Sequence, residues 1–159
     1  MNPELFWIAV CATSAGSGLM AGVFFAFSVA VMPALARRPA AEAIRAMQTI
    51  NRVILNPWFL SVYLATGFLS AALVALSLSG IGWHTAGALM YLAGCMGVTG
   101  IFNLPLNNRL AAADADSAEG AQTWELYVRT WTRWNHVRSV ACLAAMVLFY
   151  LAISPHSRS

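Results

Sequence analysis

Charged side chains are scarce in this chain of 159 residues, where Asp, Glu, Lys and Arg make up 9% of the sequence. An ordinary soluble domain carries about a quarter. Lysine is absent, so all nine basic residues are arginines, and the net charge is +3. No charged residue occurs between Arg52 and Arg109. Too few charges remain to cover a surface that faces water. The composition therefore excludes a soluble enzyme domain, a nucleic-acid-binding protein and a disordered segment.

Cysteine and metal-ligand motifs are equally sparse. Cys11, Cys95 and Cys142 each lie inside an apolar stretch without CxxC spacing, which indicates neither a disulfide framework nor a zinc site. No HxxxH, HExxH or Glu-rich helical pair occurs. His84 and His136 are expected at opposite ends of the bundle, about 30 Å apart, so they cannot share one metal or one haem. We therefore predict no metal site.

Long apolar runs dominate what is present, since 60% of the residues are hydrophobic. A spanning helix needs about 20 mostly apolar residues, and four stretches meet or approach this length. They cover about residues 5–32, 58–78, 83–104 and 137–153. The last is short and is expected to continue from the helix before it, and the first is expected to be a retained span rather than a signal peptide. The prediction is an all-α integral membrane four-helix bundle, with residues 1–159 forming a single membrane domain.

The connections between the spans differ in length. A tight turn at Ser79-Gly80-Ile81-Gly82 joins the second and third spans, and two long connections contain amphipathic helices at about residues 39–55 and 120–137. All arginines except Arg158 fall in or beside these long connections. Because basic residues favour the cytoplasm, we expect both long connections to be cytoplasmic and both termini external.

The two halves of the chain resemble each other. Pro33 is followed four residues later by Arg37, and Pro105 is followed four residues later by Arg109. An Asn-x-Val triplet then precedes the next span in each half, at 51–53 and 135–137. This pattern is typical of two parallel helical hairpins related by an axis along the membrane normal.

One face of each amphipathic segment is apolar or aromatic and carries polar amides. At 100° per residue, one face of the first segment holds Ile44, Met47, Gln48, Asn51 and Leu55. The corresponding face of the second segment holds Trp124, Tyr127, Trp131, Trp134, Asn135 and Arg138. Its opposite face holds Glu125, Arg129, Arg133 and His136.

These inner faces place a group of polar side chains beneath an aromatic cover, namely Asn51, Asn103, Asn107, Asn135 and Arg138. A buried polar group costs several kcal/mol unless it is hydrogen-bonded. Two interpretations stay open. The side chains satisfy one another and join the two halves, or they line a pocket that awaits a ligand.

Five blocks resemble a known family. They are residues 22–28 (GVFFAFS), 31–35 (VMPAL), 47–51 (MQTIN), 103–107 (NLPLN) and 131–138 (WTRWNHVR). Together they resemble the DUF1772 or anthrone-oxygenase-like family of small four-span membrane proteins, over nearly the whole chain. Some members convert an anthrone to an anthraquinone with molecular oxygen and without a cofactor, and many bacterial relatives have no assigned reaction. We accordingly expect the protein in a bacterial inner membrane.

The resemblance implies a division of roles among the polar and aromatic residues. An aromatic slot would bind a lipophilic aromatic substrate by offset stacking, through Trp124, Tyr127, Trp131 and Trp134. An enolate oxygen would be stabilised by Arg138, Asn135, Asn51 and Asn107, with Asn103 also in the substrate-binding set. His136 or Tyr127 would act as the base, although His136 shares the face of Arg129 and Arg133 and can equally face solvent or headgroups.

Two other functions remain open at this stage. The same pocket would serve a non-enzymatic protein that binds a membrane lipid, a quinone or haem. Alternatively, the arginine-rich connections would make the chain a structural partner in a membrane complex or a homo-oligomer. No cofactor is predicted for the oxygenase, and haem belongs only to the alternative.

Overall fold

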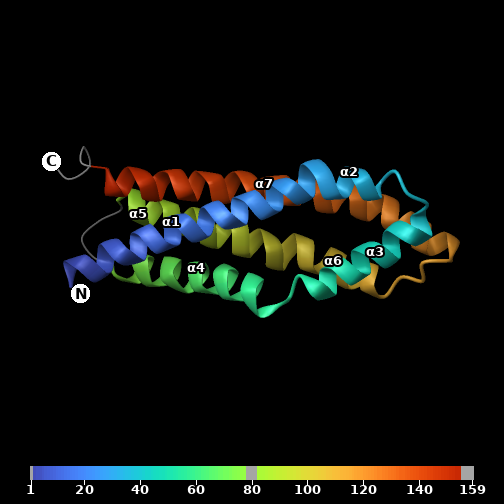
Figure 1. Cartoon of the computed structure of the whole chain (residues 1–159), viewed down its shortest axis with the longest axis horizontal. Helices are drawn as coiled ribbons and strands as arrows, with labels where there is room; N and C mark the ends of the chain where they lie inside the picture. Colours follow the sequence, from blue (N-terminus) through green and yellow to red (C-terminus); the bar gives the residue numbers. More distant parts are fainter. Residues whose placement is uncertain (1, 78–81, 155–159) are drawn as a thin grey trace.

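The computed structural model describes residues 2–77 and 82–154, and every regular element in these two ranges is helical. Four helical segments are long and apolar enough to cross a membrane, at Pro3–Leu35, Pro57–Ala75, Trp83–Ala111 and Ala118–Ile153. They lie side by side along the long axis of the molecule (Figure 1). The predicted all-α four-helix membrane bundle is confirmed.

The first segment combines α1 (Pro3–Ala26), the π-helical turn η1 (Phe27–Val31) and the short helix α2 (Met32–Leu35). The side chain of Asn2 caps it by accepting a hydrogen bond from the backbone N–H of Glu4 at 2.9 Å. Proline lacks an N–H and its ring crowds the carbonyl four residues earlier. The π-helical turn directly before Pro33 accommodates this constraint without ending the segment.

The third segment repeats this arrangement. It runs through α5 (Trp83–Met90), the π-helical turns η2 (Tyr91–Gly97) and η3 (Thr99–Asn103), and α6 (Leu104–Ala111). Here η3 directly precedes the pair Leu104-Pro105, as η1 precedes Met32-Pro33. Of the predicted turn before it, Ser79, Gly80 and Ile81 lie outside the described residues.

The two halves diverge after these prolines. In the first half α3 (Ala40–Val53) ends before α4 (Pro57–Ala75), which begins at a proline and is capped by Asn56. In the second half α7 (Ala118–Ile153) is one helix of 36 residues. No proline interrupts the sequence between Pro105 and Ser154. The predicted amphipathic connection at 120–137 and the predicted span at 137–153 therefore form a single helix.

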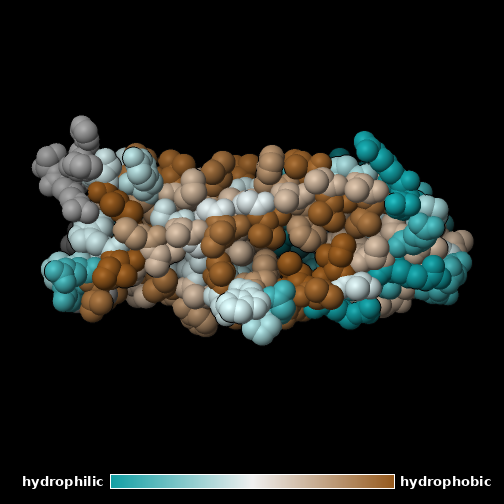
Figure 2. Space-filling model, viewed as in Figure 1, coloured by the Kyte–Doolittle hydropathy of each residue, from teal (hydrophilic) through white to brown (hydrophobic). Residues whose placement is uncertain are grey.

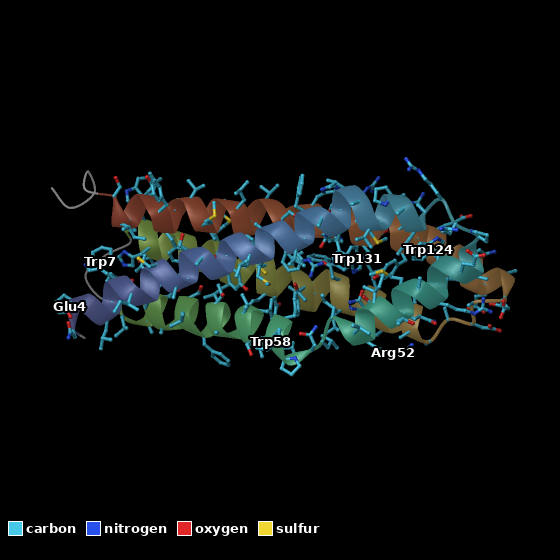
Figure 3. All side chains as sticks on the ribbon, in the orientation of Figure 1. Glu4, Trp7, Arg52, Trp58, Trp124 and Trp131 are labelled. Carbon is cyan, nitrogen blue, oxygen red and sulfur yellow. The ribbon has the colours of Figure 1, made fainter. Side chains whose placement is uncertain are left out.

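The arginine-rich end of the bundle, called the basic end below, extends beyond the apolar band. It contains α2, α3, the last residues of α6 and the first half of α7 (Figure 1). Figure 2 shows a largely apolar surface along the bundle and a hydrophilic surface at this end. Trp58, at the start of α4, is 85% exposed and marks the boundary between the two surfaces (Figure 3). Exposed tryptophans are typical of the interface between hydrocarbon and headgroups.

Two separate cores follow from this division. The core of the membrane-spanning part is built on small and aliphatic residues, with Tyr91, Cys95, Cys142 and Phe149 at its centre. The core of the basic end is built on methionines and aromatic rings, and α3 contributes Ala43, Ile44 and Met47. The candidate site lies where these two cores meet.

Candidate functional site

A cavity of about 140 Å³ lies between the two cores and is bordered by α1, α3, α4, α6 and α7. Its walls are mainly apolar, and its polar lining residues are Asn51, Tyr63, Thr99, Asn107 and Arg138. Leu55 and Leu104 also line it and are exposed at the surface, so the cavity opens sideways through the apolar band. Figure 2 shows a hollow in this band, between α1, α3 and the start of α4, with hydrophilic atoms at its floor.

Arg138 is the charged residue of this cavity. It projects from α7, is 6% exposed, and lies with its guanidinium carbon 4.1 Å from the centre of the Phe24 ring and 5.3 Å from that of Trp131. Its Nη1 donates to Thr99 Oγ1 at 3.2 Å, and its Nη2 donates to Asn135 Oδ1 at 2.5 Å. The two aromatic faces stabilise the cation by cation–π attraction and fix the plane of the guanidinium.

The charge of Arg138 is not neutralised within the protein. No carboxylate of residues 2–77 and 82–154 forms an ion pair with it, and its buried Nε has no hydrogen-bond partner among them. An ionised group in an apolar environment normally pairs with an opposite charge or with backbone carbonyls. The cavity therefore presents a fixed positive charge with spare hydrogen-bonding capacity.

Asn135 holds Arg138 in place one layer behind the cavity. Its Nδ2 donates to the carbonyl of Phe24 and to Ser28 Oγ, both at 2.6 Å. These bonds join α7 to the junction of α1 and η1, where the helical hydrogen-bond pattern changes register. Asn135 is fully buried; its Nδ2 donates to Phe24 and Ser28, and its Oδ1 accepts from Arg138. It supports the site without facing the cavity.

A second group of hydrogen-bonded side chains reaches the cavity from the basic end. The hydroxyl of Tyr127 donates to Asn107 Oδ1 at 2.8 Å and accepts from Asn51 Nδ2 at 3.4 Å. Asn51 and Asn107 line the cavity, whereas Tyr127 lies behind them. The sequence left two interpretations open, mutual satisfaction and a pocket. Of the hydrogen bonds expected within the polar group itself, the described residues show the one between Arg138 and Asn135, whereas Asn51 and Asn107 pair with Tyr127 and border an open space.

The predicted aromatic residues separate into three positions. Trp124, Tyr127 and Trp131 stack along the inner face of α7 with successive ring centroids 5.7 Å apart. Of these, Trp131 borders the cavity, and Trp124 lies farther toward the basic end (Figure 3). Trp134 is half-buried and stacks on Phe102 at 3.6 Å, outside the cavity. Of the four rings that were predicted to form an aromatic slot, Trp131 is therefore the one that lines the cavity.

Asn103 and His136 lie apart from the cavity lining. Asn103 is buried and donates through Nδ2 to the carbonyl of Trp131 at 3.2 Å, while its Oδ1 has no partner in the described part of the chain. His136 is exposed on the outer face of α7, as are Arg129 and Arg133. Among the described residues the cavity is lined by no histidine and no carboxylate.

Sequence reasoning missed three residues that shape the site, Phe24, Tyr63 and Thr99. They lie on α1, α4 and η3, which are apolar nearly all round, so periodicity does not mark which side faces the bundle. The block GVFFAFS pointed toward Phe24, and a polar residue within an apolar span is a weak signal for Tyr63 and Thr99.

The described residues offer no evident metal centre. No group of three or more His, Cys, Asp or Glu side chains within residues 2–77 and 82–154 is placed to hold a metal ion. His84 lies near the chain termini, where its Nε2 is 3.1 Å from Ser77 Oγ. It is therefore far along the bundle from Arg138 and His136.

Comparison with known protein families identifies a match. The family model described as anthrone oxygenase matches residues 45–148, which is more than half of the chain. No curated protein and no solved structure matches. The matched range contains Asn51, Asn107, Trp131 and Arg138, and it excludes Phe24 and the rest of α1.

Proposed function

Because the chain belongs to the anthrone oxygenase family, we propose that it is a membrane-embedded oxygenase that binds a lipophilic aromatic substrate beside Arg138 and needs no cofactor. The observation that carries the proposal is the buried guanidinium held between Phe24 and Trp131 at the edge of an apolar cavity, with no carboxylate partner among the residues that the structure describes. Such a charge is suited to an anion that forms during a reaction.

The reaction class needs a carbon acid, oxygen and a stabilised anion. A methylene between aromatic rings loses a proton to give an enolate, the enolate carbon bonds to O₂, and protonation gives a hydroperoxide. Loss of water from the hydroperoxide leaves a ketone, so that one CH₂ and one O₂ become one C=O and one water. The enolate oxygen would accept hydrogen bonds from Arg138, and the amides of Asn51 and Asn107 would bind further oxygens of the substrate.

The size of the cavity limits how the substrate is bound. A closed protein cavity of about 150 Å³ admits benzene, so about 140 Å³ accommodates one aromatic ring. The other rings of a polycyclic substrate would extend past Leu55 and Leu104 into the lateral opening. The substrate would therefore enter from the hydrocarbon, where an apolar molecule concentrates.

No histidine or carboxylate of the described residues lines the cavity to accept the proton of the substrate. Tyr127 contacts the cavity only through Asn51 and Asn107, and His136 lies on the outer face of α7. We assign the main effect to Arg138, which favours the anionic substrate, and the proton passes to water at the level of the headgroups, where the substrate ionises before it enters the cavity. In His136→Ala the cavity stays whole, so a large loss of turnover in that variant would move the reaction to the outer face.

Oxygen uptake by the purified chain with dithranol or emodin anthrone tests the proposal. Uptake should be stoichiometric with the ketone product and should fall by about a hundredfold or more in Arg138→Gln, the range found when one oxyanion donor is removed. Arg52→Gln is the matched control, because Arg52 is exposed on α3 and its side chain donates a hydrogen bond to Thr49, away from the cavity lining. Equal rates in the two variants would overturn the role of Arg138, and a Soret band in the purified protein would overturn the cofactor-independent reaction.

Non-enzymatic binding is the second candidate, and the absence of a histidine or carboxylate from the described cavity lining favours it. A binding protein would retain an anionic aromatic compound in an Arg138-dependent manner and would consume no oxygen. Equilibrium binding measured alongside oxygen uptake separates the two functions.

We also propose that the basic end is cytoplasmic. Seven arginines of α2, α3, α6 and α7 and their connections lie there, at positions 37, 38, 45, 52, 109, 129 and 133. Basic residues next to spans favour the cytoplasmic side. A reporter enzyme that is active only outside the cytoplasm should therefore be active when it is fused after the last residue of the chain. An inactive reporter there would contradict the proposed orientation.

A further inference from the structure

Two adjoining hollows lie on the outer face of α7, away from the cavity beside Arg138. The first has a volume of about 280 Å³, lies between α2 and α7, and is bordered by Arg129 and Arg133. The second, of about 550 Å³, is a groove between α1 and α7 that passes Gly18 and Gly22. His136 borders both hollows, so they adjoin at this side chain, and the two together are called the depression below.

Both hollows have mainly apolar walls, but they differ in the charge of the side chains that border them. Arg129 and Arg133 are exposed, and neither forms an ion pair within residues 2–77 and 82–154. Thr132 borders the same hollow, and its buried Oγ1 has no hydrogen-bond partner in the described part of the chain. In the described part of the chain the groove is lined by no Arg, Lys, Asp or Glu, and Val140 and Leu143 stand exposed along it.

Along the bundle, the basic hollow and the apolar groove follow each other in the same order as the headgroup and the acyl chain of a lipid. The basic hollow is formed at the level of α2, and the groove continues from it along α1 into the apolar band. A Cβ added at Gly22 would meet no atom within 4 Å, so the groove is open beside this residue. A phosphate is attracted by paired arginines, and an acyl chain is stabilised by an apolar groove.

We propose that this depression is a binding site for one anionic phospholipid. The phosphate lies between Arg129 and Arg133, and one acyl chain lies in the groove beside Gly22. Charge complementarity favours a lipid over a second copy of this chain. In a two-fold contact centred on the depression, Arg129 and Arg133 would face the same arginines of the partner.

Native mass spectrometry of the delipidated full chain tests the site, with dioleoylphosphatidylglycerol and dioleoylphosphatidylcholine as the two probes. The wild type should bind phosphatidylglycerol more tightly. The double variant Arg129→Gln/Arg133→Gln should weaken this binding by about thirtyfold, since each arginine near an anionic headgroup contributes about 1 kcal/mol. The matched control Arg52→Gln/Arg109→Gln removes the same charge from the basic end and should keep the preference.

A second pair of variants tests the groove without changing any charge. Gly22→Leu fills the open space beside α1, whereas Gly100→Leu adds the same side chain at another glycine whose Cβ would meet no atom within 4 Å. Gly22→Leu should lose bound phosphatidylglycerol, and Gly100→Leu should retain it. This pair decides the matter if the double arginine variant fails to fold, and Arg129→Lys/Arg133→Lys should restore binding if charge is the cause.

Two results would overturn the proposal. Equal binding of the two lipids by the wild type would remove the role of the arginines. A change from dimer to monomer in Gly22→Leu, with lipid binding intact, would assign the groove to contact between copies of the chain. Neither result depends on oxygen uptake, so the lipid site and the proposed oxygenase stand or fall separately.

Discussion

The inner and outer faces of α7 carry similar residues in opposite surroundings. Arg138, on the inner face, is buried between Phe24 and Trp131, and its hydrogen bonds fix its orientation. Arg133, on the outer face, is exposed and has no ion pair within the described residues. One helix therefore presents one guanidinium that is oriented by the protein and another that is free to follow a mobile anion.

The difference shows what burial adds to an arginine. An exposed arginine keeps its hydration and contributes little to stability. A buried one loses hydration, and aromatic rings and amides recover part of that loss. Because Arg138 has no carboxylate partner in the described residues, stability alone gives a weak reason for its burial. Four predictions test this contrast between the faces.

The largest effect is expected on the inner face from Asn135→Ala. The substitution removes two bonds of 2.6 Å to α1 and η1 and leaves Arg138 with one fewer acceptor. The free energy of unfolding should fall by about 3 kcal/mol, because buried groups of the partners become unsatisfied. Denaturant titration in mixed micelles measures it. The exposed Asn108→Ala should change it by less than about 0.5 kcal/mol, and similar losses in both would contradict the buried network.

A smaller effect is expected from Thr99→Val, which keeps the shape of the side chain and removes the acceptor for Arg138 Nη1. Oxygen uptake should show a fall in kcat/KM of about tenfold, the value for one hydrogen bond to a charged group. Thr49→Val is the control, since the Thr49 hydroxyl donates to the Arg45 carbonyl at the exposed side of α3. An unchanged kcat/KM in Thr99→Val would mean that Arg138 needs no such support.

Tyr127→Phe should have a milder effect that appears mainly in KM. The aromatic stack with Trp124 and Trp131 persists, but Asn51 and Asn107 lose the hydroxyl that holds them. We expect KM to rise by about fivefold, equivalent to roughly 1 kcal/mol. Tyr150→Phe, on the exposed apolar surface, is the matched control. A loss confined to kcat would instead favour Tyr127 as the proton acceptor.

The smallest effect is expected at an exposed ion pair of the basic end. Arg45 and Asp116 contact each other with both side chains more than half exposed. Arg45→Gln should lower the free energy of unfolding by less than about 1 kcal/mol, and the difference should vanish at high salt. Thermal unfolding at two salt concentrations measures this, with Arg37→Gln as the control. A large, salt-independent loss would show that exposure does not predict the role of an arginine here.

Much of the fold was predictable because the spans are continuous apolar runs. The second and third spans begin close to the predicted positions, at Pro57 and Trp83. The continuity of α7 was foreseen only as an expected extension of the fourth span. It follows from the absence of proline in this part of the sequence, whereas Asn56-Pro57 separates α3 from α4.

The candidate site was predictable only where a helix is amphipathic. The spacing of Trp131, Asn135 and Arg138 places all three on one face, and all three are buried. The same reasoning cannot find Tyr63 or Thr99, because their segments are apolar on nearly every side. Which of their side chains meets Arg138 depends on how the helices are rotated against each other, and that is set by packing between distant parts of the chain.

Because α7 is one unbroken helix that contributes side chains to both cores, the directions in which these side chains point are fixed relative to one another. Each residue of an α-helix advances the chain by 100°, so deleting a single residue near Arg129 would rotate the preceding stack of rings relative to Arg138 by that angle. Trp124 and Tyr127 could then not keep their places beneath α3 while Arg138 stayed between Phe24 and Trp131. A seven-residue deletion, close to two full turns, would largely restore the phase. Keeping this rotation is therefore necessary for any change in the length of the helix, which also shifts the rings along the axis by about 1.5 Å per residue.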